Sequence, residues 1–183
     1  MNIQEAQREV RSAFLGGFVG QLIAGAIWGL SAAVSTWGTP GLGMAVLFFV
    51  SMFLFPLTQF TLKLIGRSGT LSPNNTLNQL AMQIAFTVPI GFILVGAATL
   101  YRQNWFYPAS MIIVGAHYLP FIFLYGMPQF AFLAGLLIVG GIGIGLYGPD
   151  AFSVGGWISA VILILFAFIG RRAILREETD RTK

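Results

Sequence analysis

Six long apolar stretches without a charged residue dominate this chain of 183 residues. Each is close to the roughly 20 residues that a helix needs to cross a hydrocarbon core of about 30 Å. Short segments rich in glycine, proline, serine and asparagine separate them. We therefore predict an all-α fold, a polytopic membrane protein built as a bundle of six transmembrane helices. The predicted spans cover residues 14–34, 41–60, 80–100, 106–125, 130–147 and 154–170.

The charge content supports this fold class. Charged residues make up 9% of the chain, whereas a soluble domain carries about 25%. So few charges cannot cover a water-facing surface, which excludes a soluble globular enzyme, a disordered chain and a nucleic-acid-binding protein. The chain has no cysteine, so disulfides, thiolate metal sites and cysteine nucleophiles are excluded as well.

Positive charges lie almost entirely on one side of the predicted topology. With six spans, both termini share that side with the loops after the second and fourth spans. Nine of the ten lysines and arginines lie there, and only Arg102 lies on the other side. We predict a single transmembrane domain, residues 1–183. The positive-inside rule predicts that its loop 61–79 and its tail 171–183 are cytoplasmic. The nine cations are Arg8, Arg11, Lys63, Arg67, Arg171, Arg172, Arg176, Arg181 and Lys183.

A short helix is predicted ahead of the first span. Asn2 can cap it, and Glu5 stands three positions later, which is the spacing of a capping box. Ala6 and Val10 continue one apolar stripe, so we expect residues 2–11 to form an interfacial helix.

Aromatic residues cluster at the predicted outer ends of the spans. Amphipathic rings favour the headgroup level, so we interpret them as an aromatic belt rather than as a ligand cage. The residues are Trp37, Trp105, Phe106, Tyr107, Tyr147, Phe152 and Trp157.

His117 is the only histidine and the only side chain within the spans that could titrate near neutral pH. Counted at ~1.5 Å per residue from Phe106, it lies about 16 Å deep, near the midplane. A polar residue at this depth is a candidate for function. Alternatively, it is a structural link, bonded to a Gln, a Thr or a free carbonyl of a neighbouring helix. Pro120 would free the carbonyl of Ala116 for such a bond.

Other polar side chains within the spans could join the histidine in one pocket. Gln21 lies in the first span, Gln83 and Thr87 lie in the third, and Tyr118 follows His117 in the fourth. If these three spans meet, the five residues form a candidate ligand-binding pocket for a small solute. We expect no metal site and no cofactor.

Prolines and glycines occur within several of the predicted spans. Pro56, Pro89 and Pro120 lie in three adjacent spans, where kinks could open a central cavity or could be packing features. Glycines four residues apart allow helices to approach closely, and we favour contacts within the chain over contacts between chains. These pairs are Gly16 and Gly20, Gly25 and Gly29, and Gly141 and Gly145.

The chain lacks the residues that several membrane activities require. Ion pumps and proton-driven carriers usually bury a charged residue in the membrane, and these spans contain none. Intramembrane aspartyl and zinc proteases, a retinal Schiff base and a haem held by two histidines are excluded in the same way. Ser31 with His117 would depart from the order and spacing of a rhomboid protease. We therefore expect no enzymatic activity.

Two resemblances are visible. Residues 20–28, 35–38 and 115–120 resemble an uncharacterised family of small bacterial six-helix membrane proteins, and this resemblance extends over the whole chain. It implies a bacterial inner-membrane location and no activity. Residues 56–72 resemble the proline–glutamine loop of SWEET-type sugar transporters, although two residues separate the proline from the glutamine here.

Three classes of function remain. A transporter or channel for a small neutral or weakly polar solute fits the prolines and the polar residues near the midplane. A non-catalytic accessory, assembly or stress-related protein fits the lack of charged residues within the spans. A membrane-embedded enzyme or lipophilic-ligand binder is the third class, limited by the single histidine. The expected partners are membrane lipids and a small-molecule solute but no nucleic acid, and homo-oligomer formation is left open.

Overall fold

The computed structural model describes residues 1–181, so Lys183, one of the predicted cytoplasmic cations, lies outside the described part. The secondary structure of the described residues is entirely helical, which confirms the all-α prediction. Five helical segments are long and apolar enough to cross a membrane, and there are six if the bent pair α3 and α4 counts as one span. The elements are α1 (Ile3–Ala13), η1 (Leu15–Gly17), α2 (Phe18–Trp37), α3 (Pro40–Ser51), α4 (Leu54–Leu64), α5 (Asn78–Tyr101), η2 (Gln103–Trp105), α6 (Phe106–Tyr118), α7 (Phe121–Tyr125), α8 (Gln129–Tyr147) and α9 (Val154–Arg181).

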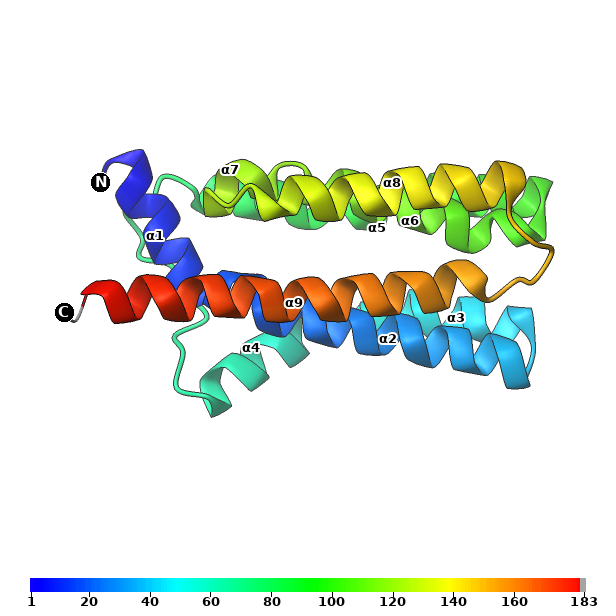
Figure 1. Ribbon diagram of the computed structural model, residues 1–183, viewed down its shortest axis with the longest axis horizontal. Helices are drawn as coiled ribbons and strands as arrows, with labels where there is room; N and C mark the ends of the chain where they lie inside the picture. The colour runs from blue at the N-terminus through cyan, green and yellow to red at the C-terminus, as the bar shows by residue number, and fades with distance from the viewer. Residues whose placement is uncertain (182–183) are drawn as a thin grey trace.

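The helices pack as two units (Figure 1). In the first unit α2 packs against α9, α3 and α4. In the second unit α6 packs against α5 and α8, and α7 continues α6. Helix α9 contacts both α8 and α6, and so holds the two units together. We call the contact surface between the units the junction.

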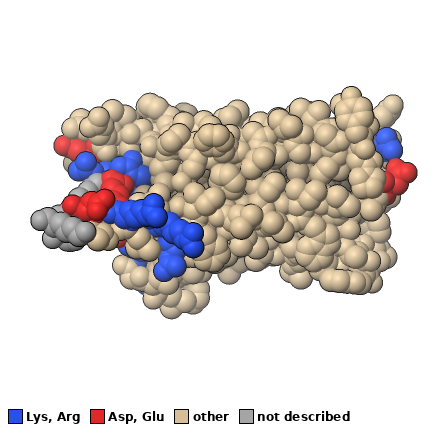
Figure 2. All heavy atoms as spheres, in the orientation of Figure 1, with Lys and Arg blue, Asp and Glu red and all other residues tan. Residues whose placement is uncertain are grey.

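The N-terminus and the end of α9 lie at the same end of the bundle (Figure 1). On the face shown in Figure 2, charged side chains gather at this end, which we call the charged end, and a broad uncharged belt follows. At the opposite end, Nη2 of Arg102 lies 3.4 Å from Oδ1 of Asp150. This distribution matches a bundle whose middle is surrounded by lipid.

Helix α1 begins with the predicted capping box. The Asn2 side chain accepts a hydrogen bond from the Glu5 N–H, and the Glu5 carboxylate accepts one from the Asn2 N–H. Ala6 and Val10 are buried, as the apolar stripe indicates. The helix crosses the charged end of the bundle and contacts α7 (Figure 1).

The predicted span 41–60 consists of two helices that differ in direction by 55°. The break lies between Ser51 and Leu54 rather than at Pro56, where the sequence allowed a kink. Pro56 is the third residue of α4, and N–H groups in the first turn of a helix have no intrahelical partner. A proline there removes no hydrogen bond. Helix α4 leaves the line of α3 and angles away from the bundle (Figure 1).

The other two prolines also have distinct roles. Helix α5 continues without a break through Pro89. Pro120 lies at the break between α6 and α7, where the Ala116 carbonyl accepts the N–H of Leu119 at 3.2 Å. The carbonyl that the sequence offered to His117 is therefore already bonded.

Glycines bring helices close together within the chain. A Cβ on Gly25 of α2 would lie 2.6 Å from Cγ1 of Ile164 on α9. A Cβ on Gly141 of α8 would lie 2.7 Å from the Pro108 carbonyl oxygen on α6. Both contacts are tighter than a side chain allows, so each position requires glycine.

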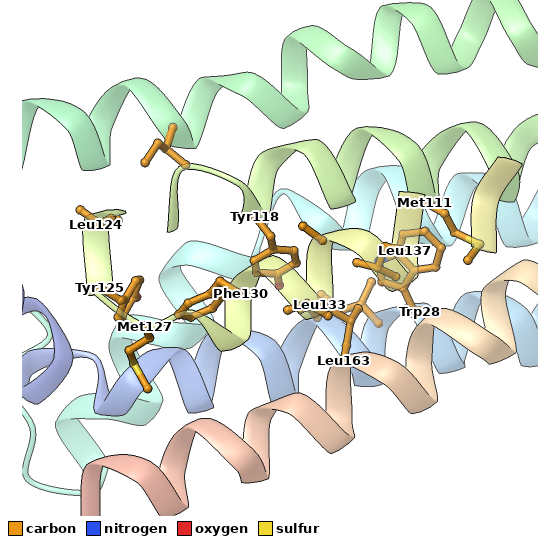
Figure 3. Close-up of a cluster of buried hydrophobic side chains, with 14 of the residues drawn as sticks. Trp28, Met111, Tyr118, Leu124, Tyr125, Met127, Phe130, Leu133, Leu137 and Leu163 are labelled. Carbon is orange, nitrogen blue, oxygen red and sulfur yellow. The ribbon is translucent and has the colours of Figure 1, made fainter. Parts of the chain in front are cut away.

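Large apolar side chains fill the middle of the junction (Figure 3). Leu133 and Leu137 of α8 and Leu163 of α9 are 0% exposed, and Trp28 of α2 is 4% exposed. Phe130, also fully buried, lies nearer the charged end in this row (Figure 3). We call these five residues the apolar layer.

Candidate functional site

The structure brings two of the predicted site residues into contact. Nδ1 of His117 on α6 and Oγ1 of Thr87 on α5 are 2.8 Å apart. The Thr87 hydroxyl has one hydrogen and donates it to the Ile84 carbonyl at 2.7 Å. With the hydroxyl hydrogen on that carbonyl, the matching tautomer of His117 donates from Nδ1 and leaves Nε2 as an unprotonated acceptor. This is the bond to a neighbouring helix that the structural-link hypothesis describes.

The second ring nitrogen of His117 opens onto the outer surface of the bundle. The imidazole is only half-buried, and Thr87 and Ala116 beside it are exposed. Nε2 has no hydrogen-bond partner among residues 1–181 and does not belong to their buried polar atoms without a partner. The rings of Tyr118 and Phe121 lie 5.6 and 5.0 Å from the imidazole, measured between centroids. His117 therefore links two helices and still presents one acceptor to the bilayer.

The other predicted pocket residues lie apart from this pair. Gln83 is exposed on α5, one turn before Thr87. Tyr118 turns into the core and stacks on Phe130 at a centroid distance of 6.1 Å. Gln21 is buried on α2, in the first unit, whereas α5 belongs to the second. Because the first and third spans lie in different units, the structure does not gather the five residues around one pocket.

A hollow of about 410 Å³ opens at the charged end, where the two units meet. Its walls come from α1, from the turn between α7 and α8, and from α9. Its size falls within the range of about 300–1,000 Å³ that is typical of small-molecule pockets. The lining residues are Arg11, Gly126, Met127, Pro128, Gln129, Ala173, Ile174 and Glu177.

The buried Gln21 and the half-buried Gln129, at this end of the junction, have buried amide atoms without hydrogen-bond partners within the described residues. The atoms are Nε2 of Gln129 and both Nε2 and Oε1 of Gln21. A Cβ on Gly170 of α9 would lie 2.9 Å from Nε2 of Gln129, so this amide faces across the junction. A Cβ on Gly17 would lie 3.7 Å from Nε2 of Gln21 and 3.3 Å from Cζ of Phe130, which places this amide beside α8. A buried amide without a partner costs about 1–3 kcal/mol, so a polar guest would be stabilised here.

At the opposite end of the junction, three hydroxyl groups satisfy one another. Tyr107 of α6 is 0% exposed. Its Oη lies 2.6 Å from Oγ of Ser31 and 2.9 Å from Oγ of Ser35, both on α2. Ser31 donates to the Gly43 carbonyl on α3 at 2.7 Å. Tyr107 therefore ties the second unit to the first, and it is not part of the aromatic belt to which the sequence analysis assigned it.

Arg11 of α1 lines the hollow and binds residues of both units. Its Nε and Nη2 each donate to one carboxylate oxygen of Glu177 on α9, both at 3.0 Å. Its Nη1 donates to the Tyr125 carbonyl at the end of α7, at 2.7 Å. Since α9 belongs to the first unit and α7 to the second, this one side chain bridges the junction.

The predicted cytoplasmic loop 61–79 is held against α1. The Glu9 carboxylate accepts hydrogen bonds from the N–H and hydroxyl of Ser72 and from the Asn75 amide. The Ser72 N–H contributes most to keeping the pKa of Glu9 below its ordinary value. Arg67 forms a two-bond pair with Glu178 at 2.7 and 3.0 Å, and this bond raises the pKa of its guanidinium. The loop is therefore an ordered part of the charged end.

These features define a multi-pass helical membrane protein with a hollow at one end of its central junction, lined by both apolar and polar residues. Residues 3–172 match DUF7010, a family of unknown function, and the chain belongs to this family. This match confirms the resemblance to an uncharacterised family. No curated protein and no solved structure matches the chain. The local likeness of residues 56–72 to SWEET-type transporters stays a prediction.

Proposed function

We propose that this protein is a carrier for a small neutral or weakly polar solute, which crosses the membrane along the junction between the two units. The observation behind the proposal is the hollow of about 410 Å³, with the unpartnered Nε2 of Gln129 and the unpartnered amide of Gln21 at the same end of the junction. A solute with hydroxyl or amide groups would complete the hydrogen bonding of both side chains.

The apolar layer serves as the barrier of the closed state. It includes Leu163 of α9. Ser159 precedes Leu163 by one turn of this helix and therefore lies nearer the opposite end. The Ser159 hydroxyl is buried without a hydrogen-bond partner in the described part of the chain. Polar groups therefore flank the layer on both sides. In this conformation the route is open at the charged end and closed at the opposite end.

The charges of the site favour a neutral solute and downhill movement. The spans contain no lysine, arginine, aspartate or glutamate that could bind an ion or drive coupling. At the mouth, Arg11 and Glu177 neutralise each other. The carrier would therefore equalise the concentration of its solute across the membrane rather than accumulate it.

The placement in the membrane follows from the positive charges. The positive-inside rule supports a cytoplasmic charged end, with both termini there, and the family resemblance supports a bacterial inner membrane. The hollow then opens towards the cytoplasm.

Swelling of proteoliposomes tests the proposal. Vesicles with the purified protein are mixed with urea, glycerol or erythritol, and solute entry is followed by light scattering. We expect entry of at least one solute to be faster than into empty vesicles, and slower again in Gln129→Leu and Gln21→Leu. The exposed Gln83→Leu is the matched control and should behave as wild type. Entry no faster than into empty vesicles for every solute would contradict the proposal.

A non-catalytic accessory or assembly role is the second candidate, and the ordered charged end favours it. There α1, the loop 61–79 and the end of α9 form one fixed surface through Glu9, Arg11 and Arg67. This candidate predicts no solute entry. It also predicts that function responds to substitutions on this surface rather than to those of the junction glutamines.

A further inference from the structure

We propose that the bilayer-facing surface beside His117 binds a lipid-soluble molecule that carries a hydroxyl group, with Nε2 of His117 as the hydrogen-bond acceptor. This surface lies between α5 and α6 on the outside of the second unit. It is separate from the junction, so the inference does not depend on the carrier proposal.

The bond to Thr87 holds the His117 imidazole in one protonation state. The single hydrogen of the Thr87 hydroxyl is used on the Ile84 carbonyl, so Nδ1 of His117 carries the ring proton. Nε2 is then a lone-pair acceptor held in one orientation by two packed helices. It suits a donor such as a hydroxyl group and does not suit a second acceptor such as a ketone.

Thr87 and His117 lie deep within the apolar part of the bundle. Thr87 is nine residues beyond the start of α5 at Asn78, which places the pair about 14 Å along the helix. Acyl chains at that level offer no hydrogen-bond donor. A polar atom left without a partner in hydrocarbon is unfavourable, so a donor from the lipid phase would be stabilised there.

Aromatic side chains lie beside the imidazole and next to Thr87. The Phe121 ring lies 5.0 Å from the imidazole between centroids. Phe86, next to Thr87 on α5, is 62% exposed. These rings offer apolar and stacking contacts to the body of a ligand. The shared chemistry is therefore a hydroxyl on an apolar body, and a quinol ring and the alcohol of a glyceride are two sources of it.

Nitrogen-15 NMR tests the proposal because the chain has one histidine, so labelled histidine reports on this ring alone. The protein is placed in lipid nanodiscs and titrated with decylubiquinol, with decylubiquinone and with dioctanoylglycerol. Before addition we expect a protonated Nδ1 and an unprotonated Nε2. Decylubiquinol should move the Nε2 signal in a saturable way, whereas decylubiquinone, which lacks the hydroxyl donor, should not.

The two hydroxyl probes distinguish the sources. A response to decylubiquinol alone identifies a phenolic ligand, and a response to dioctanoylglycerol as well identifies a general alcohol site. Both results support the proposal. It is overturned if neither probe moves the signal or if decylubiquinone moves it equally. It is also overturned if Nε2 is already hydrogen-bonded without a probe and loses that bond on dilution of the protein, since a second copy then covers the site.

A matched pair of threonine variants completes the test. Thr87→Val removes the hydroxyl that fixes the ring proton and should weaken probe binding about fivefold. Thr99→Val is the control because Thr99 makes the same kind of bond on the same helix, to the Val95 carbonyl at 2.7 Å. It should leave both the His117 signals and probe binding unchanged. Equal weakening in both variants would show a general effect on α5 and contradict the role of Thr87.

Discussion

The two ends of the junction satisfy their polar groups in different ways. At the opposite end, the Tyr107 hydroxyl bonds Ser31 and Ser35, and all three groups are buried. Between this cluster and the apolar layer, only the buried Ser159 hydroxyl lacks a partner within the described residues. At the charged end, the buried Gln21 amide and the buried Nε2 of Gln129 lack partners within the described residues, and a hollow lies beside Gln129. Complete bonding favours a fixed contact, whereas incomplete bonding favours a place for a guest. The comparison therefore assigns stability to one end and function to the other.

Gly156→Leu should have the largest effect on stability, because it disrupts the packing at the opposite end of the junction directly. A Cβ on Gly156 would lie 2.9 Å from Cβ of Ala32 and 2.9 Å from the Tyr107 ring, so a larger side chain would force α9 away. We expect a loss of about 3 kcal/mol or no folded protein. Thermal unfolding in detergent measures it. Gly143→Leu on α8 is the control, since its Cβ meets nothing within 4 Å and its stability should stay near wild type.

Tyr107→Phe should have the next largest effect. It keeps the ring but removes the hydroxyl, which leaves Ser35 without its partner. We expect a loss of about 2 kcal/mol in the same unfolding assay. Tyr118→Phe is the matched control because the structure gives the Tyr118 hydroxyl no hydrogen bond among residues 1–181. Equal losses in both variants would mean that the hydroxyl cluster does not fasten the junction.

Gln21→Met should change stability in the opposite direction. The substitution replaces a buried amide without a partner by an apolar side chain of similar size, so stability should rise by about 1 kcal/mol. Solute entry in the vesicle assay should fall at the same time. A stability loss would show that the Gln21 amide has a partner in the membrane, and the difference between the two ends of the junction would disappear.

Glu9→Gln should have the smallest effect and tests whether the charged end depends on pH. The pKa of Glu9 lies below its ordinary value of about 4.5 in the folded protein. Its stabilising contribution is therefore complete above about pH 4.5 and is lost as the pH falls through the lower folded value. We expect a loss of less than about 1 kcal/mol at pH 7, because the carboxylate is partly exposed. Below that folded value the variant and the wild type should unfold alike, and a difference that persisted through the whole acid titration would contradict this role.

Much of the fold follows from the sequence because membrane spans are encoded locally. Apolar runs of helical length and the capping box of Asn2 and Glu5 depend on neighbouring residues, so their pattern predicts the helices and α1. A kink is one of the two roles that the sequence allows Pro56, whereas the bend between α3 and α4 lies between Ser51 and Leu54. A proline within an apolar run suggests a kink, but Pro56 lies in the first turn of α4, where it removes no hydrogen bond and does not kink that helix.

The candidate site was less accessible to sequence reasoning because it depends on which helices are neighbours. The contact of Thr87 with His117 was among the predicted options, since a threonine one span away is a suitable partner. Gln129 was missed because it stands at the end of a loop, next to Pro128. Tyr107 was assigned to the belt because its partner Ser31 lies 76 residues away in the chain, and no local signal reports such a contact.

Thiol accessibility in oriented membranes tests the central claim most directly, and the chain has no native cysteine to interfere. Ala173→Cys places a thiol in the lining of the hollow, and Ser159→Cys places one beyond the apolar layer. The account predicts rapid reaction of the first with a membrane-impermeant reagent added at the charged end, and protection of the second from that side. A protected thiol at position 173, or equal reaction at both positions, would contradict a junction that is open at the charged end and closed beyond it.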